Sequence, residues 1–161
     1  MRATISSSCF RLVLAIAFLF SQNAAFGGTS PPAYDSSLTI TYPGNGVNLT
    51  TGATFNVLGN VIPARRRNVD DTAWVVILPR VLCEIFFTQD EATFYLMNSS
   101  TTSVSFPSDI SANGVFDGTL TATQQGNFID GYYVDATALD QFNNVTNVVD
   151  TVAVAITKPG S

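Results

Sequence analysis

The residue types that usually perform catalysis are sparse in this chain and poorly arranged for it. Histidine is absent from all 161 residues, which removes the commonest general base and the commonest transition-metal ligand. Two adjacent acid pairs, Asp70–Asp71 and Asp90–Glu91, are the candidates for glycoside hydrolysis, which needs two carboxyl groups around the scissile bond. Both pairs fall in expected loops, and neighbouring residues on a strand point apart. We interpret them as solvated loop charges and expect no enzyme.

The two cysteines offer little nucleophilic or redox chemistry. Cys9 precedes a solidly apolar run, and Cys83 lies within the apolar sequence Val81-Leu-Cys-Glu-Ile-Phe86. No histidine is present to activate either thiol. We expect Cys83 to be buried and unpaired, and a disulfide between chains is the alternative. No cofactor is expected.

Aspartates punctuate the segment Asp130-Gly-Tyr-Tyr-Val-Asp-Ala-Thr-Ala-Leu-Asp140. Asp130 and Asp140 lie at its ends, where loop carbonyls would complete the oxygen shell that Ca²⁺ requires. Asp135 is expected on the face opposite Val134. The spacing matches no dedicated calcium loop, and turn-capping explains Asp130 and Asp140 equally well. Both remain calcium candidates beside that alternative, and no other metal site is expected.

Three Asn-x-Ser/Thr sequences are acceptors for N-linked glycan in a secreted eukaryotic protein. They begin at Asn48, Asn98 and Asn144. All three are expected in turns or loops, which are accessible at the surface. At least one is expected to carry glycan in a eukaryotic host.

Tyr42, Tyr133 and Phe142 are candidates for ligand contact, with Tyr95 as a further one. An exposed aromatic ring offers an apolar platform on which a sugar ring stacks. Ordinary packing in the core or at a sheet edge is the favoured alternative.

Arg65, Arg66 and Arg67 are consecutive and form the only basic cluster after residue 27. The cluster has three interpretations: a processing site, a contact for an acidic partner, or a loop charge run balanced by Asp70 and Asp71. The third is favoured.

The amino terminus has the organisation of a secretory signal peptide. Residues 1–11 carry two arginines and no acid, and Leu12–Phe20 is an unbroken apolar run of nine. A membrane-spanning helix needs about 20 such residues, so this run is too short to span a bilayer. Small residues fit cleavage after Gly27. We expect a signal peptide over 1–27, and a mitochondrial presequence is the disfavoured alternative.

The remaining chain is expected to form one domain over 38–158, between a loose tail at 28–37 and a short tail at 159–161. After residue 27 it holds five basic and twelve acidic residues, a net charge of −7. Nucleic acid is therefore an unexpected partner, because phosphate binding needs a basic face. No second apolar run is long enough to span a membrane.

Alternation of apolar and polar residues predicts an all-β chain with little helix. Ala73–Leu78 is nearly continuous apolar, which predicts a central strand buried on both faces, and Asn60–Asp71 is expected to be a loop. The expected strands are 38–42, 53–58, 73–78, 81–87, 92–97, 119–123, 132–139 and 148–156.

Two segments carry a resemblance to a known class of module. Asp130–Asp140 resembles the penultimate strand of bacterial-type immunoglobulin-like and fibronectin-type modules. The sequences Ile40-Thr-Tyr-Pro-Gly-Asn-Gly46 and Thr51-Gly-Ala-Thr-Phe-Asn-Val57 resemble their first two strands. This opening is also similar to the amino-terminal domain of some fungal cell-wall proteins.

The resemblance implies an immunoglobulin-like antiparallel β-sandwich of seven or eight strands. It implies that Trp74 is the core tryptophan and that Tyr132 is the tyrosine near the start of the sixth strand. The chain departs from antibody-type domains because Cys83 has no partner for the disulfide between the sheets.

We therefore expect a secreted, non-enzymatic binding module that acts through end loops or an open sheet edge. Its partner would be an extracellular protein or glycan, at a cell surface or in a wall, and the module itself a monomer or weak oligomer. One alternative is a structural subunit that assembles through edge strands or Cys83. Another is a carbohydrate-active protein that uses its acids.

Overall fold

The computed structural model describes residues 34–108, 113–123 and 130–158. All regular structure in these residues is β-strand, which confirms the all-β prediction. Within the same ranges, no helix is long and apolar enough to cross a membrane. The predicted signal peptide over 1–27 and the tail over 159–161 lie outside the described residues, as does most of the predicted tail over 28–37.

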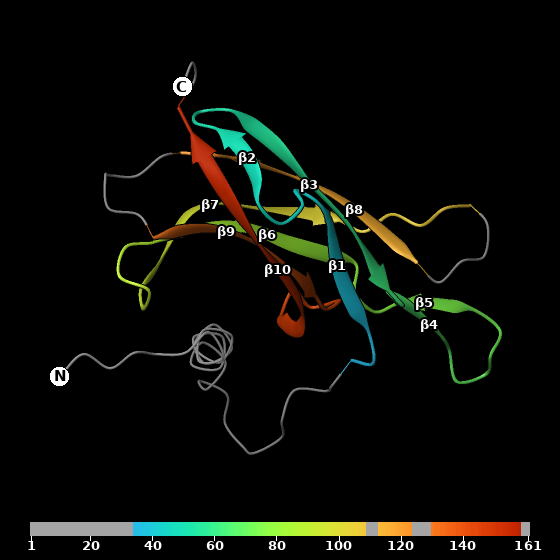
Figure 1. Cartoon of the computed structure of the whole chain (residues 1–161). Helices are drawn as coiled ribbons and strands as arrows, with labels where there is room; N and C mark the ends of the chain where they lie inside the picture. Colours follow the sequence, from blue (N-terminus) through green and yellow to red (C-terminus); the bar gives the residue numbers. More distant parts are fainter. Residues whose placement is uncertain (1–33, 109–112, 124–129, 159–161) are drawn as a thin grey trace. The chain divides into compact units, whose positions relative to one another are not determined.

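In the described residues, eight strands form two sheets and two short strands form a separate hairpin. The three-stranded sheet has the order β1-β3-β8, and the five-stranded sheet has the order β2-β10-β9-β6-β7 (Figure 1). Neighbouring strands are antiparallel except β2 and β10, which are parallel. The bounds are β1 Ser37–Tyr42, β2 Val47–Thr50, β3 Thr54–Ile62, β4 Arg65–Arg67, β5 Trp74–Val76, β6 Arg80–Thr88, β7 Phe94–Ser103, β8 Gly114–Thr121, β9 Gly131–Leu139 and β10 Val145–Thr157.

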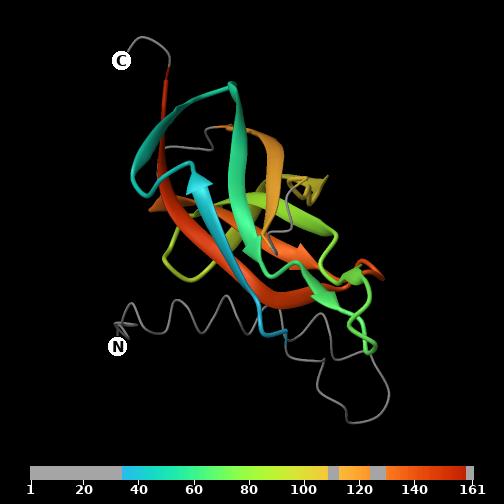
Figure 2. The ribbon, with the colours of Figure 1, turned by 90° about the vertical axis from the view of Figure 1, so that its right-hand side faces the viewer.

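This strand order is that of an immunoglobulin-like sandwich. In such folds the first, second and fifth strands share one sheet, and the third, sixth and seventh share the other, which in variable-type domains gains a further strand. Here β1, β3 and β8 occupy the first set, and β6, β9 and β10 occupy the second, with β7 added at the edge. β2 continues β1 after a turn and joins the other sheet, beside β10 (Figure 2). The predicted fold class is confirmed.

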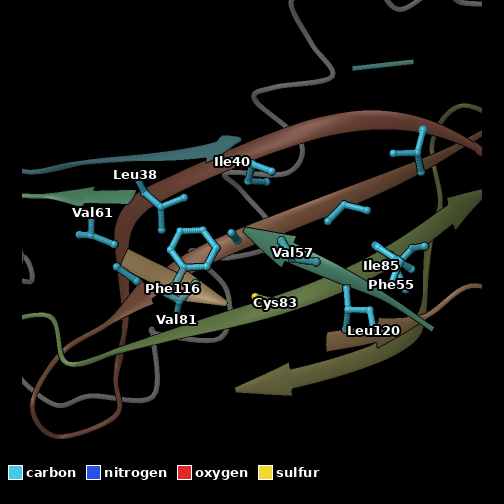
Figure 3. Packing of buried hydrophobic residues seen from close by; sticks show 14 of the residues in the cluster. Leu38, Ile40, Phe55, Val57, Val61, Val81, Cys83, Ile85, Phe116 and Leu120 are labelled. Atoms are coloured by element: carbon cyan, nitrogen blue, oxygen red, sulfur yellow. The ribbon is translucent and has the colours of Figure 1, made fainter. Parts of the chain in front are cut away.

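Alternating side chains from both sheets fill the space between them. On β3, Phe55, Val57 and Val61 are buried, whereas the intervening residues are more exposed. β6 and β8 alternate in the same way. Burial of apolar surface is the dominant stabilising term, so this alternation decides which face of each strand turns inward. Figure 3 labels the residues that meet between the sheets: Leu38, Ile40, Phe55, Val57, Val61, Val81, Cys83, Ile85, Phe116 and Leu120.

Cys83 and Gly118 meet across the core. Cys83 is fully buried and unpaired, and a Cβ atom at Gly118 would lie only 2.6 Å from its Sγ. The predicted burial of Cys83 is confirmed. Burial raises the pKa of the thiol to about 12, and the charges of Glu84 and Asp117 add to the rise. The buried sulfur and the raised pKa of the thiol do not favour assembly through a Cys83 disulfide.

The prediction of a central strand over Ala73–Leu78 is wrong. Only Trp74–Val76 is strand, and it pairs with β4 in a hairpin outside the two main sheets. Val75 and Val76 are 40% and 38% exposed, and Trp74 is only partly buried. The corresponding third strand of the sandwich is β6, which pairs with β7 and β9 on its two sides. Its inward residue Cys83 takes the core place assigned to Trp74.

Further boundaries differ from the predictions. β8 spans Gly114–Thr121 instead of the expected 119–123. The expected loop Asn60–Asp71 instead contains the end of β3 and all of β4. β2 was not expected, because its four residues include a single buried one. β7 continues through the polar Ser99–Ser103 segment, which an edge strand tolerates because one of its sides is not paired in the sheet.

Candidate functional site

Asp130 and Asp140, the calcium candidates, lie at opposite ends of β9. An Asp130 oxygen accepts a hydrogen bond from the Glu91 backbone N–H at 2.8 Å. Asp140 accepts from the backbone N–H groups of Phe142 and Asn144, each at 2.8 Å. Each aspartate thus caps a turn. In the described part of the chain, no group of three His, Cys, Asp or Glu side chains is arranged to hold a metal ion.

The acid pairs considered for glycoside hydrolysis are separated in the fold. Asp71 follows β4 and lies 3.4 Å from Arg67 in an exposed ion pair. Asp90 lies in the β6–β7 turn, where it accepts a hydrogen bond from the Thr93 backbone N–H at 3.0 Å. The two pairs therefore flank the two ends of β6, which nine residues at about 3.3 Å each place roughly 25–30 Å apart. Carboxyl groups of a glycosidase lie within about 10 Å of each other.

Two of the three glycan acceptors lie on strands, which corrects the expectation that all occupy turns. Asn48 is exposed on β2. Asn98 lies on β7, partly buried, and its side-chain oxygen accepts a hydrogen bond from the Thr121 backbone N–H at 3.0 Å. Asn144 lies in the β9–β10 turn and donates to Asp140 at 3.0 Å.

The aromatic candidates lie in four different places. Tyr42 ends β1 and is 39% exposed, and Phe142 is 73% exposed in the β9–β10 turn. Tyr95 on β7 is 42% exposed and stacks on Phe87, with ring centroids 5.0 Å apart. Tyr133 lies on β9 and meets Phe94 edge to face at 6.0 Å. Tyr42 and Phe142 are thus isolated, whereas Tyr133 belongs to a larger apolar cluster.

That cluster lies on the outer face of the five-stranded sheet. The register pairs Phe86 of β6 with Tyr133 of β9 on one side and with Leu96 of β7 on the other. Directly paired residues share a face, and residues two apart along a strand do so too. Phe94, two residues before Leu96, therefore joins them. We call Phe86, Phe94, Leu96 and Tyr133 the outer aromatic patch; Leu96 is 52% exposed.

An unusual carboxyl group occupies the same outer face, further along β9. Asp135 is 1% exposed and pairs with Glu84 of β6 and Thr151 of β10. Neither carboxylate oxygen has a hydrogen-bond partner among the described residues. Burial raises the pKa of Asp135 to about 6, and the charges of Glu84 and Asp150 add to the rise.

The arginine cluster occupies a different surface, the β4–β5 hairpin. Its register places Arg65 and Arg67 on the same face as Trp74. The Arg67 guanidinium carbon lies 4.7 Å from the centroid of the Trp74 ring, and that of Arg65 lies 5.1 Å from it. Arg65 also lies 4.8 Å from the Phe106 ring. Trp74 is therefore a cation–π partner at the surface, not a core residue.

No family model matches the chain, and no curated protein is similar to it in sequence. Solved structures with a related arrangement include murine CRIg, with a TM-score of 0.37 and 11% identity over 78% of this chain and 100% of that chain. Another is the complex of titin M10 with an obscurin-like 1 Ig domain, with a TM-score of 0.30 and 15% identity over 78% and 99% of the two chains. The fold class itself rests on the strand order described above.

Sequence reasoning identified Tyr133 and the three arginines but missed the residues that accompany them. Phe86 and Phe94 were assigned to a hairpin without a face, because β7 carries a bulge at Met97, opposite Ile85 and Phe86, that shifts its register on β6. Period-two alternation breaks at such a bulge. The sequence signal that was available is the aromatic density of Phe86-Phe87 and Phe94-Tyr95 on the two sides of one turn.

Proposed function

We propose that this chain is a secreted, non-enzymatic module that binds an extracellular protein through the outer aromatic patch and the adjacent edge of β7. The immunoglobulin-like sandwich is compatible with a binding or structural role. The observation that carries the proposal is Leu96, a large apolar side chain that is 52% exposed on an edge strand. Grouped apolar residues at a surface commonly mark a protein contact.

The backbone around Leu96 supports the same proposal. Among the described strands, β7 pairs in the sheet only with β6, and its side-chain hydrogen bonds to β8 come from Asn98 and Thr102, which follow Leu96. One side of residues 94–96 therefore has no described strand beside it. A partner strand can add to such an edge through main-chain hydrogen bonds, with side-chain contacts supplying specificity. The patch residues lie directly beside that edge.

A protein partner is favoured over a glycan by the geometry of the rings. Phe94 and Tyr133 pack at an interplanar angle of 61°, so the edge of one ring meets the face of the other. Sugar binding uses ring faces that are flat and accessible, whereas the most exposed member of this patch is the aliphatic Leu96. A glycan at Asn48 would occupy β2, at the opposite edge of the sheet from β7.

The proposal is tested with the secreted protein and two matched variants. Leu96→Asp places a charge in the patch, and Val149→Asp places one at an outer-face residue of β10 that is 44% exposed. We expect an extracellular partner to be captured by the unmodified protein and by Val149→Asp but not by Leu96→Asp. A partner retained by Leu96→Asp, with all three proteins folded by circular dichroism, contradicts the proposed surface. Amino-terminal sequencing of the secreted protein checks cleavage after Gly27.

Self-assembly through β7 is the second candidate, since the same open edge can pair with a copy of itself. Light scattering of the purified protein distinguishes partner binding from self-assembly. A monodisperse monomer at high concentration supports partner binding, and a dimer lost in Leu96→Asp supports assembly.

A further inference from the structure

We propose that the β4–β5 hairpin is a second binding site, which takes an acidic polysaccharide that carries carboxylate or sulfate groups. The hairpin precedes β6, and the outer aromatic patch surrounds the end of β6, so the two surfaces lie at opposite ends of that strand. Figure 1 shows the hairpin at one end of the sandwich and the β6–β7 turn at the other.

Positive charge is concentrated at the hairpin. Of the five basic residues after residue 27, four lie between Arg65 and Arg80. The chain as a whole is acidic, but at physiological ionic strength charges more than about 8 Å apart are largely screened from each other. A ligand at the hairpin therefore responds to the local arginines rather than to the net charge.

Two of the arginines are oriented before any ligand arrives. Trp74 holds the Arg65 and Arg67 guanidinium groups against its ring at 5.1 and 4.7 Å. Cation–π contact uses the face of a guanidinium, and in-plane donors match the two oxygens of a carboxylate or sulfate. Arg67 contacts Asp71 through Nε and Nη1, and a ligand can replace this exposed carboxylate, whereas Arg65 Nε is buried. Prior ordering lowers the entropy that binding costs.

Arg66 is the arginine most available to a ligand. It pairs with Val75 on the opposite face of the hairpin from Trp74 and is exposed. Among the described residues, the Arg66 side chain makes no hydrogen bond or ion pair. An open hollow of about 400 Å³ lies beside it, lined by Arg66, Arg67, Asn68, Val69 and Val75.

The acids of the hairpin neutralise the cluster only in part. Asp71 contacts Arg67 at 3.4 Å, with side chains 80% and 45% exposed respectively. Such exposed pairs are weak and exchange readily with other partners. Three arginines and two aspartates leave the hairpin with a positive balance.

The form of the hairpin favours a polysaccharide over other polyanions. Strands of three residues offer too few main-chain groups for an acidic peptide to add as a strand, so recognition must use side chains. Duplex nucleic acid presents a charge about every 1.7 Å and needs a broader basic face. Val69 and Val75 beside the guanidinium groups offer apolar contact to sugar rings. The choice of an extracellular polyanion rests on the proposed secretion.

The test measures binding of the whole secreted protein to four immobilised polymers at 0.15 M salt. The polymers are polygalacturonate, dextran sulfate, neutral dextran and poly-L-glutamate. We expect binding to one or both acidic polysaccharides and little to dextran or polyglutamate. Comparing binding to polygalacturonate, which carries carboxylates, with binding to dextran sulfate, which carries sulfates, identifies the anionic group that the hairpin recognises. Arg66→Ala should weaken binding about tenfold, and Asp70→Asn should strengthen it.

Control variants test whether a loss of polysaccharide binding comes from the hairpin itself, and not from misfolding or from the outer aromatic patch. Lys158→Ala removes one positive charge at the end of β10 and should leave binding unchanged, as should Leu96→Asp. Circular dichroism verifies that every variant is folded. Equal binding to polyglutamate, no binding to either acidic polysaccharide, or an equal loss in Arg66→Ala and Lys158→Ala would each overturn the proposal.

Discussion

The outer aromatic patch and the β4–β5 hairpin both place aromatic rings at the surface, but the rings have different partners. In the patch, Phe94 and Tyr133 pack edge to face beside the exposed Leu96. In the hairpin, Trp74 packs against guanidinium groups. An aromatic residue therefore does not define a surface by itself. The side chains that the register places opposite it determine whether the surface is apolar or basic.

The two regions also differ in the backbone that supports them. The patch lies on strands of nine and ten residues within a five-stranded sheet. The hairpin consists of two three-residue strands that pair only with each other in the described chain. Short two-stranded sheets are marginal without further packing. We infer that Trp74 and its arginines contribute much of the order of the hairpin, whereas the patch is held by the sheet beneath it.

The largest effect on the free energy of unfolding is expected from Asp135, which lies on the same outer sheet face as the patch and not in the hairpin. Its pKa rises from 3.8 to about 6 on folding. The folded state therefore binds more protons between about pH 4 and pH 6, so stability from this group is greatest below pH 4 and is lost as the pH rises through 6. Asp135→Asn should raise the free energy of unfolding at pH 7 by up to about 3 kcal/mol.

Urea denaturation at pH 4.5 and pH 7 measures this effect. Asp117→Asn, at an exposed position on β8, is the matched control and should change little. A variant Asp135→Asn that keeps the pH dependence of the unmodified protein contradicts the assignment.

The next largest effect is that of salt concentration, which should change the binding affinities of the two surfaces to different extents. Between 0.05 and 0.5 M NaCl, binding of an acidic polysaccharide at the hairpin should weaken about tenfold, because screening shortens the reach of the arginine charges. Binding of a protein at the apolar patch should change by less than about twofold. Surface plasmon resonance at several salt concentrations measures both, and parallel slopes would remove the distinction between the regions.

Trp74→Ala should lower the free energy of unfolding by about 1 kcal/mol, through the lost cation–π contacts and apolar packing. Polysaccharide binding should weaken a few-fold, because Arg65 and Arg67 lose the ring that orders them. Trp74→Phe should restore part of both. Thermal unfolding and the polymer assay provide the measurements, and an unchanged affinity in Trp74→Ala argues that the arginines need no such ordering.

The smallest effect concerns the glycan acceptors. Asn98→Gln should cost about 1 kcal/mol of stability, because the hydrogen bond from the Thr121 backbone N–H is disturbed. It should cause no loss of glycan mass, since Asn98 is partly buried and its side chain contacts β8. Asn144→Gln, in an exposed turn, should remove one glycan from protein secreted by a eukaryotic host. Mass spectrometry before and after enzymatic deglycosylation shows which of Asn98 and Asn144 carries glycan. Glycan found on Asn98 contradicts the prediction.

Long strands with regular alternation were predictable from their residues. β6 and β9 were expected within one or two residues of their observed bounds, because alternation over eight or nine residues leaves one consistent inward face. The prediction for Ala73–Leu78 was wrong because this segment lacks such a pattern. A continuous apolar run has no alternation, and it is compatible with a buried strand, an exposed hairpin or the chain that enters the core at Leu78, which is fully buried.

The candidate site was predictable only in its parts. Tyr133 and Arg65–Arg67 were recognised by residue type, but the partners of each come from other strands. Tyr133 meets Phe94 across an intervening strand, β6. Arg67 meets Trp74 through a hairpin whose existence the apolar run concealed.

The sequence by itself determined the all-β character, the likeness to an immunoglobulin-like sandwich, the burial of Cys83 and the scarcity of catalytic side chains. These properties depend on local alternation, on neighbours in the chain and on composition. Only the tertiary structure decided that Trp74 lies at the surface, that Asp135 is buried on an outer face and that Leu96 completes an apolar patch. Each of these depends on the register between strands distant in sequence, and register is set by how the whole core packs.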